Sequence, residues 1–321
     1  MVMRRIGSIA AGWVQSAKPG VTAAKPIPQA EPAQQPRIGT MLVPANADLH
    51  CHSTVSDGTL SPAALATRAH ANGVQIWALT DHDETSGLHE AAQAAQALGL
   101  HFVPGVEISV SVGDQTVHIV GLGIDPSNPL LLGGLAQVRA GRDTRAHLMA
   151  KALEQHTAIS GVYEGVSRYA GNPALISRTH FARYLVEQGV CGTTHEVFGR
   201  FLTPGRPGYV EHTWATLQDA VEWIRAAGGQ AVIAHPGRYR FTPTEEWALF
   251  SSFKEMGGAG VEVMTGSHTA SDFRKYASLA LAFNLRASRG SDFHSARESR
   301  CDLGQLPALP ADLPPIWELL H

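Results

Sequence analysis

The apolar run Val74–Leu79 leads directly into Thr80-Asp81-His82-Asp83, and the fold prediction starts from this stretch. The run has the length and composition of a short buried strand. In parallel β/α barrels, functional side chains gather where each strand ends. We therefore expect His82 and its neighbouring aspartates at the mouth of such a barrel. One of the two aspartates is equally suited to cap the helix that follows.

Short apolar runs alternate with amphipathic stretches on both sides of this segment. Several helix limits are marked by Ser61-Pro62 at a start, Gly99 at an end, and Thr216 and Gly228-Gly229 around another helix. Strands that alternate with helices predict a parallel β/α architecture, and seven strands predict a barrel. The predicted strands are 47–51, 74–80, 102–108, 116–122, 230–234, 260–264 and 285–290.

The alternation is interrupted between the fourth and fifth predicted strands. Residues 127–215 have an almost entirely helical pattern, so we expect a helical insert that contributes to the substrate site. Residues 41–126 and 216–321 then form the barrel. Residues 1–40 are rich in Ala, Pro and Gln and show no period, which predicts a disordered N-terminal extension.

The composition excludes several function classes. The chain has 321 residues with 44% hydrophobic and 17% charged residues, enough for one large domain or a domain with an insert. Its net charge of −3 offers no overall basic excess for wrapping nucleic acid or binding a membrane surface. No stretch reaches the roughly 18 apolar residues of a membrane span. The three cysteines fit no disulfide or zinc-ribbon spacing, which predicts a reducing cytoplasm.

A second polar cluster, Asp48-Leu49-His50-Cys51-His52-Ser53, ends the first predicted strand and is followed by Asp57. Residues two apart on a strand point to the same side, so His50 and His52 face together and Cys51 faces the core. Two histidines at one strand end are a natural half of a metal site, although the pattern alone is weak evidence.

Four further predicted strands carry the same kinds of side chain. Glu107 and His118 interrupt apolar strands, His235 follows a third, and Asp292 and His294 follow the last with the same spacing of two. A carboxylate in an apolar strand must be paired or bound to metal, because an isolated buried charge is costly. Six strands with His, Asp or Glu at corresponding places predict a shared site at a barrel mouth. Such mixed nitrogen and oxygen ligands suit Mn²⁺, Fe²⁺ or Zn²⁺ in pairs or triples.

The ordered set of these residues resembles that of the PHP family, named for polymerase and histidinol phosphatase. The resemblance covers about residues 47–300 and implies a distorted (β/α)7 barrel that holds three divalent metal ions, with Mn²⁺ as first choice and Fe²⁺ or Zn²⁺ as alternatives. The implied ligands are His50, His52, Asp57, His82, Glu107, His118, His235, Asp292 and His294.

The family's positions also imply a grouping of these ligands. His50, His52, Glu107 and Asp292 would hold the first ion, and Asp57, His82 and His294 the second. Glu107 would bridge to a third ion held by His118 and His235.

Several longer motifs resemble one branch of the family more closely. These are Asp48–Ser53 with Ser56-Asp57-Gly58, Leu79–Asp83, Ser177–Ala182 and Ser291–His294. They are similar to the 3′,5′-nucleoside bisphosphate phosphatases, whose members also act as 5′–3′ exoribonucleases on short RNA. The resemblance implies removal of the 3′-phosphate from nucleoside 3′,5′-bisphosphates and possession of the same helical insert. The sequence itself gives no reason to expect a membrane or an obligate protein partner.

The branch also implies roles for individual residues. Arg178, His180 and Asp83 would bind substrate, and Asp57, Asp83 and His294 would take part in catalysis. Arginine suits phosphate because its planar donors bind two oxygens at once. Two further features stay open: Arg139, Arg142 and Arg145 form either a phosphate-binding ridge or a solvated helix face, and His268 either lines the pocket or is background.

Two rival functions remain beside this one. The first is a phosphatase of another small phosphomonoester such as histidinol phosphate. Histidinol phosphatases of the family usually have His where this chain has Asp57, which argues against that substrate. The second is a non-catalytic module that binds metal for structure. Such modules lose ligands, whereas all nine positions are filled here.

Overall fold

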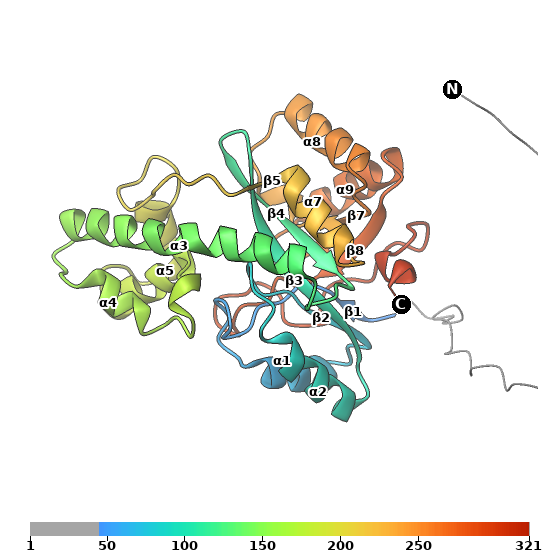
Figure 1. The fold of residues 1–321 in the computed structure, drawn as a ribbon, viewed down its shortest axis with the longest axis horizontal. Helices are drawn as coiled ribbons and strands as arrows, with labels where there is room; N and C mark the ends of the chain where they lie inside the picture. The colour runs from blue at the N-terminus through green and yellow to red at the C-terminus, as the bar shows by residue number, and fades with distance from the viewer. Residues whose placement is uncertain (1–44, 321) are drawn as a thin grey trace, which may run out of the picture. The chain divides into compact units, whose positions relative to one another are not determined.

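A computed structural model describes residues 45–320, and the predicted extension, residues 1–40, lies outside the described residues. Seven strands form one sheet in the order β1-β2-β3-β4-β6-β7-β8, and β5 pairs with β3 (Figure 1). Each predicted strand has a counterpart among these seven. With β5 the sheet has eight strands: β1 (Ala47–Asp48), β2 (Ile76–Leu79), β3 (His101–Val112), β4 (Gln115–Leu122), β5 (Ala215–Thr216), β6 (Gln230–Ile233), β7 (Gly260–Thr265) and β8 (Arg286–Gly290).

Hydrogen bonds between the first and last strands close the sheet. The backbone nitrogen of Leu49 donates to the carbonyl of Arg289 at 3.0 Å, and that of Asp292 donates to the carbonyl of His50 at 2.9 Å. An isolated parallel bridge joins Cys51 to Phe293 just beyond. The prediction of a distorted barrel is therefore confirmed.

The prediction of parallel strands throughout is wrong at β4. This strand pairs antiparallel with both β3 and β6, while the other neighbours along the sheet order run parallel. The reason is the short turn at Gly113-Asp114, because a parallel connection needs a crossover of a dozen or more residues. The start of β4 therefore lies at the edge where the parallel strands end.

Five long helices follow strands of the barrel: α1 (Pro62–Ala71), α2 (Leu88–Leu98), α7 (Leu217–Ala226), α8 (Pro243–Glu255) and α9 (Ala270–Ala282). Their ends agree with the local signals in the sequence. The Ser61 side chain accepts from the backbone of Ala64, and Thr216 begins α7 with a capping box. Gly99 ends α2 in the left-handed conformation, with φ of 70°. Two short helices, η3 (Pro236–Arg238) and η4 (Ile316–Leu319), complete this part.

The segment between β4 and β5 is helical. It contains α3 (Pro129–His156), α4 (Val162–Ser167), η1 (Pro173–Leu175), α5 (Arg178–Glu187), α6 (Thr194–Val197) and η2 (Phe198–Leu202). Figure 1 shows α3 running from α7 to α4 and α5. At its start α3 approaches α7 so closely that a Cβ on Gly134 would lie 2.3 Å from the ring of Trp223. Its second half packs into a separate apolar cluster with Phe181 and Leu202.

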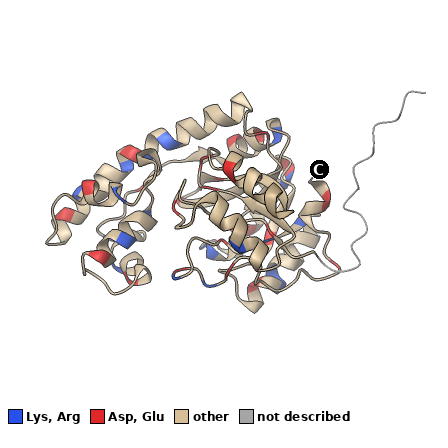
Figure 2. Cartoon of the chain, turned by 90° about the horizontal axis from the view of Figure 1, so that it is seen from below, with Lys and Arg blue, Asp and Glu red and all other residues tan. Residues whose placement is uncertain are grey.

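Charged residues of both signs occur on the barrel and on the helices of residues 129–202 (Figure 2). None of the helices between residues 45 and 320 combines the length and the hydropathy of a membrane span.

Candidate metal centre

All nine predicted ligands meet at the edge of the barrel where the parallel strands end. Their nitrogen and oxygen atoms form four groups, and within each group these atoms lie within 4.8 Å of one another. The groups are His52, Asp57, His82 and His294; His50, His52 and Glu107; His50, His235 and Asp292; and His82, Glu107 and His118. The overlap between groups makes this one continuous cluster.

Strand geometry brings these side chains together. His50 and His52 follow β1 on the same side, whereas Cys51 points into the core, where its sulfur accepts from the indole nitrogen of Trp77 at 3.3 Å. His118 lies early in β4, yet it reaches the same edge because β4 runs antiparallel to its neighbours.

Glu107 is the centre of the cluster. Its carboxylate is fully buried, and its Oε1 lies 2.9 Å from Nδ1 of His118 and 3.0 Å from Nε2 of His235. Its Oε2 lies 2.9 Å from Nδ1 of His82 and 3.3 Å from Nε2 of His52. A carboxylate with imidazoles on both oxygens is suited to bridge two cations.

Two aspartates complete the negative charge of the cluster. The Oδ1 atom of Asp292 lies 3.3 Å from Nε2 of His52, and the Oδ1 atom of Asp57 lies 3.3 Å from Nε2 of His294. Burial alone would raise the pKa of Asp57, but the imidazoles of His294 and His82 outweigh it and hold the pKa well below its ordinary value. The pKa values of Glu107 and Asp292 are lowered in the same way, since nearby imidazoles outweigh burial. The cluster thus keeps its carboxylates ionised.

The pKa values of four imidazoles, those of His50, His52, His82 and His235, are shifted in two opposite directions. Burial lowers the pKa of His82 to about 4 and that of His235 to about 3, so both are neutral and offer a lone pair at neutral pH. Burial opposes the charged form of His52 too, but the neighbouring carboxylates of Asp292 and Glu107 outweigh it and raise its pKa to about 10. His50 is also raised well above its ordinary pKa, because Glu262 and Glu107 outweigh burial. The surrounding carboxylates therefore favour positive charge at His50 and His52.

Unsatisfied polar atoms test whether a metal fits this cluster. Buried polar groups nearly always have a partner, and exceptions require an explanation. Seven buried side-chain atoms in residues 45–320 make no hydrogen bond of normal geometry, and five of them belong to predicted ligands. These five are Nδ1 of His52, Oδ1 of Asp57, Nδ1 of His82, Oε2 of Glu107 and Oδ1 of Asp292. Mixed donors of this kind suit divalent cations, so the residues fit metal ions.

The backbone is strained at the same place. Four residues other than glycine have positive φ in the described chain, and three of them lie in or beside the cluster: Asp83 at 50°, His235 at 28° and Asp292 at 55°. Such conformations are costly and persist where the surroundings hold them. Their concentration here is typical of a functional site.

Asp83 lies beside the cluster but is fully engaged with other residues. Its Oδ1 accepts from the backbone nitrogen of Ser109 at 2.8 Å, and its Oδ2 accepts from Nε of Arg142 at 2.9 Å and from the Ser109 hydroxyl. Arg139 donates to the Asp83 carbonyl at 2.7 Å. Asp83 therefore anchors helix α3 to the loop that carries His82.

The alternative that Asp81 caps the next helix is wrong. Asp81 accepts from the backbone and hydroxyl of Ser53 at 2.7 and 2.6 Å, and from the hydroxyl of Ser56 at 2.6 Å. It therefore secures the loop that leads to Asp57. Neither aspartate caps α2, whose first residue is preceded by Gly87 without a side-chain cap.

Helix α5 is tied to the cluster as well. The hydroxyl of Ser177 donates to Oδ2 of Asp57 at 2.8 Å, and Arg183 donates to the Asp57 carbonyl at 2.7 Å. The backbone nitrogen of Ser177 donates to Nδ1 of His180 at 3.0 Å, which leaves Nε2 of His180 to carry the proton. Burial lowers the pKa of His180 to about 4, so its ring is neutral.

Two arginines near the cluster have no carboxylate partner among residues 45–320. Arg178 donates weakly to the carbonyl of Leu202 at 3.5 Å, and Arg145 donates to the carbonyl of Val210 at 2.9 Å. Burial, together with the nearby charge of Arg178, lowers the pKa of Arg145 to about 9. Arg145 is buried and Arg178 is partly buried, and cations without a counter-ion in such places are suited to an anionic ligand.

The sequence did not decide whether Arg139, Arg142 and Arg145 form a phosphate-binding ridge or a solvated helix face. All three are at least partly buried, so the solvated face is wrong. Arg139 and Arg142 are engaged by the Asp83 loop. The spacing of three along the chain predicted that all three arginines share one helix face. It could not show which of the three has a counter-ion.

His268 does not contact the cluster. Its Nδ1 faces the carbonyl of Val263 at 3.1 Å, and its Nε2 accepts from the backbone nitrogen of Gly237 at 3.0 Å. Both ring nitrogens are therefore used inside the fold, and the interpretation of His268 as background is favoured.

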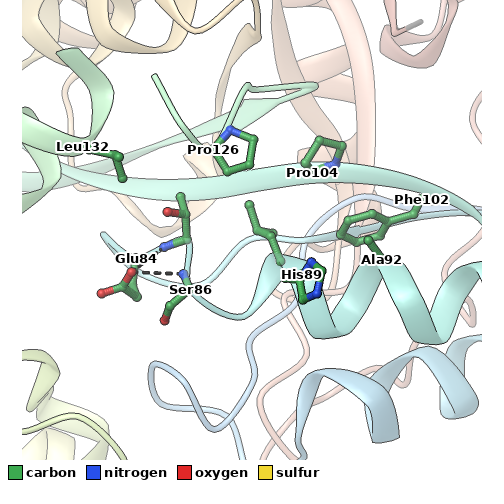
Figure 3. A pocket seen from close by; sticks show the side chains of 10 residues that line it. Glu84, Ser86, His89, Ala92, Phe102, Pro104, Pro126 and Leu132 are labelled. Atoms are coloured by element: carbon green, nitrogen blue, oxygen red, sulfur yellow. Dashed lines mark hydrogen bonds between the residues drawn. The ribbon is translucent and has the colours of Figure 1, made fainter. Parts of the chain in front are cut away.

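A cavity of about 610 Å³ lies apart from the nine ligands (Figure 3). It is mostly apolar and is lined by residues of the loop after His82, α2, β3 and the start of α3, including Glu84, His89, Phe102 and Leu132. Figure 3 shows the Glu84 carboxylate turned back toward the backbone of Ser86, where it accepts a hydrogen bond at 3.0 Å.

Comparison with known proteins agrees with this geometry. The 3′,5′-nucleoside bisphosphate phosphatase of Chromobacterium violaceum is 51% identical over 86% of this chain and 97% of its own length. The 5′-3′ exoribonuclease Rnm of Escherichia coli is 40% identical over 85% of this chain and 92% of its own. A solved structure of an amidohydrolase from Chromobacterium violaceum with bound sulfate has a TM-score of 0.83 at 51% identity, and covers 86% of this chain and 96% of that one.

The family model described as PHP domain matches residues 48–234, more than half of the chain, and this range includes Asp57, Glu107 and the whole helical segment. The relatives match across nearly their whole lengths. The fold and the clustered His, Asp and Glu side chains are those expected from the sequence. This chain therefore belongs to the PHP domain family.

Proposed function

We propose that this chain is a metal-dependent phosphoesterase that removes the 3′-phosphate from nucleoside 3′,5′-bisphosphates. The products are a nucleoside 5′-monophosphate and phosphate, and short 5′-phosphorylated RNA is a further substrate for 5′–3′ exonucleolytic cleavage. One observation carries the proposal: a cluster of nine side chains that could hold metal ions lies near Arg145 and Arg178, two arginines without a carboxylate partner in residues 45–320. The names of the relatives support the same substrates.

The proposed centre holds three divalent ions, with Mn²⁺ as the first choice. The overlap of the four ligand groups through Glu107, His50, His52 and His82 supports several ions rather than one. Divalent ions in such a site act as Lewis acids toward phosphoryl oxygens and provide a nucleophile near neutral pH. Asp57 and His294 belong to the proposed second ion site and stay the proposed catalytic pair. We also propose a cytoplasmic location, because the cysteine spacing fits no disulfide framework.

The residues beside the cluster would bind the 5′-phosphate. Arg145 and Arg178 offer guanidinium donors, and His180 offers a neutral Nε2–H donor because Ser177 occupies its Nδ1. Binding one phosphate here would leave the 3′-phosphate, or the next phosphodiester of RNA, at the metal ligands. Asp83 is not proposed as a proton donor, since Ser109 and Arg142 occupy both of its oxygens. Its proposed role is to hold α3 in place.

The substrate is tested by phosphate release in the presence of Mn²⁺. We expect adenosine 3′,5′-bisphosphate to exceed AMP and histidinol phosphate by roughly 100-fold in kcat/KM, because two charge-assisted contacts are lost without the second phosphate. Equal rates with all three would contradict the two-phosphate site. No release from any of them, with metal bound, would contradict the proposed reaction.

The phosphate-binding role of the arginines is tested by R178A and R145A. We expect each change to raise KM for the bisphosphate roughly 10- to 100-fold and to leave the metal content unchanged. R200A is the matched control, since Arg200 is exposed and already paired with Glu196 at 2.9 Å. Loss of metal from R178A or R145A, or an unchanged KM, would count against this role.

A further inference from the structure

Glu262 is a buried carboxylate that contacts two predicted metal ligands without being one of them. It lies in β7, a strand otherwise made of apolar residues, Gly and Thr, and its side chain is 1% exposed. It belongs to none of the four groups of ligand atoms. A buried carboxylate needs partners, and both of its oxygens have one at the metal centre.

The first partner is the ring of His50. Oε1 of Glu262 lies 2.8 Å from Nδ1 of His50, while Nε2 of His50 faces Glu107 at 3.3 Å and Asp292 at 3.6 Å. A proton on Nδ1, donated to Glu262, leaves the lone pair of Nε2 directed into the cluster. Gly290 leaves room for this pair, since a Cβ there would lie 2.4 Å from Cβ of His50 and 3.1 Å from Oε1 of Glu262.

The second partner is the backbone of His235. Oε2 of Glu262 accepts from the backbone nitrogen of His235 at 2.6 Å. His235 has a φ of 28°, a conformation that residues other than glycine rarely adopt. The charge-assisted hydrogen bond that the backbone of His235 donates to Glu262 therefore holds a strained residue in the conformation that directs its ring toward Glu107.

We propose that Glu262 is a positioning residue of the metal centre, which sets the ring tautomer of His50 and the backbone conformation of His235. The two histidines share one group of ligand atoms with Asp292, so one side chain orients two members of that group. The inference rests on the proposed metal centre and is independent of the proposed substrate.

Glutamine at this position cannot replace the carboxylate. The two partners are both N–H donors, and each faces a different oxygen of Glu262. An amide has one acceptor oxygen and presents N–H groups on the other side. Either the backbone of His235 loses its acceptor, or His50 must accept at Nδ1 and turn an Nε2–H toward the metal.

The first test is metal binding by E262Q, measured by equilibrium dialysis against buffered Mn²⁺ and elemental analysis. We expect a roughly 10- to 100-fold weaker affinity, the effect typical of removing a partner of a metal ligand. E246Q is the matched control, because Glu246 is also a buried carboxylate with two partners, Lys275 and Tyr276, but lies on α8 away from the cluster. E246Q should bind Mn²⁺ as the wild type does. Wild-type affinity in a folded E262Q would overturn the proposal.

A second measurement needs no variant, so it stands even if E262Q does not fold. Long-range ¹H–¹⁵N correlation of histidine-labelled wild-type protein loaded with Zn²⁺ reports the tautomer of each ring. We expect His50 to carry its proton on Nδ1 and to bind the metal through Nε2. Binding through Nδ1, with the proton on Nε2, would overturn the proposal.

Kinetics separate this inference from the proposed function. With the bisphosphate as substrate, E262Q should regain kcat as Mn²⁺ is raised, with KM close to the wild-type value. A raised KM that Mn²⁺ does not restore would contradict a positioning role. If the wild type releases no phosphate, the proposed substrate fails, while the metal-binding and tautomer measurements still test Glu262.

Discussion

Replacing Glu107 with glutamine is expected to weaken metal binding by about 10²- to 10⁴-fold and to remove activity at ordinary metal concentrations. The range follows from the roughly 3–5 kcal/mol lost when one member of a buried charged network is removed. Glu107 is fully buried and its oxygens face imidazoles on both sides, at 2.9 Å from His118 and 2.9 Å from His82. A neutral amide cannot balance the positive charge that gathers there.

The measurement is the number of Mn²⁺ ions retained per chain after dialysis, with E246Q again as the control for loss of a buried carboxylate. The wild type and E246Q should retain the same number, whereas E107Q should retain fewer. Far-UV circular dichroism establishes that E107Q is folded. An E107Q protein with a full metal complement would show that Glu107 is not a ligand of the centre.

Replacing Arg289 with methionine is expected to cost about 3–5 kcal/mol of unfolding free energy. Arg289 is 3% exposed, and its guanidinium donates to Asn46 at 2.8 Å and to four backbone carbonyls, those of Ala47, Gly304, Leu306 and Pro307. These acceptors come from the start of β1 and from the segment after the last strand. Methionine keeps much of the side-chain volume but leaves the buried carbonyls without a donor, which is the costly outcome.

Urea unfolding of the metal-free protein tests this expectation without the stabilisation that bound metal would add. R286M is the matched control on the same strand. Arg286 makes a partly exposed ion pair with Glu318 at 2.7 Å, which is worth at most about 1 kcal/mol. A loss below about 1 kcal/mol for R289M as well would mean that the buried hydrogen bonds contribute little.

Local features of the fold could be predicted from the sequence because their causes are local. Ser61 and Thr216 cap helices through side chains that reach backbone groups within three residues, and Gly99 adopts positive φ at its own position. The existence of all seven barrel strands followed from short apolar runs between such signals. The predicted strand limits differ from the observed ones by a few residues. For example, β3 extends to Val112, whereas the predicted strand ends at residue 108.

The grouping of the nine candidate ligands could also be predicted from the sequence. His50 and His52, or Asp292 and His294, share a side because of the period of two along a strand. Polar side chains at the ends of several buried strands predict one shared edge, and the nine residues do lie there. The residues that hydrogen-bond to these candidate ligands could not be predicted from the sequence. Glu262 carries the same signal as Glu107, a carboxylate in an apolar strand, but no local pattern distinguishes a ligand from a residue that orients one.

The sequence by itself therefore determined the elements, their order and the residues of the cluster, since these depend on periodicity and on neighbours along the chain. The tertiary structure alone decided the engagement of Asp83 by Arg142 and the absence of a carboxylate partner for Arg145 within residues 45–320. Asp83 and Arg142 are 59 positions apart, and Glu262 and His50 are 212 apart. Contacts across such separations depend on how the closed barrel and the helical segment pack, and a local pattern carries no record of that packing.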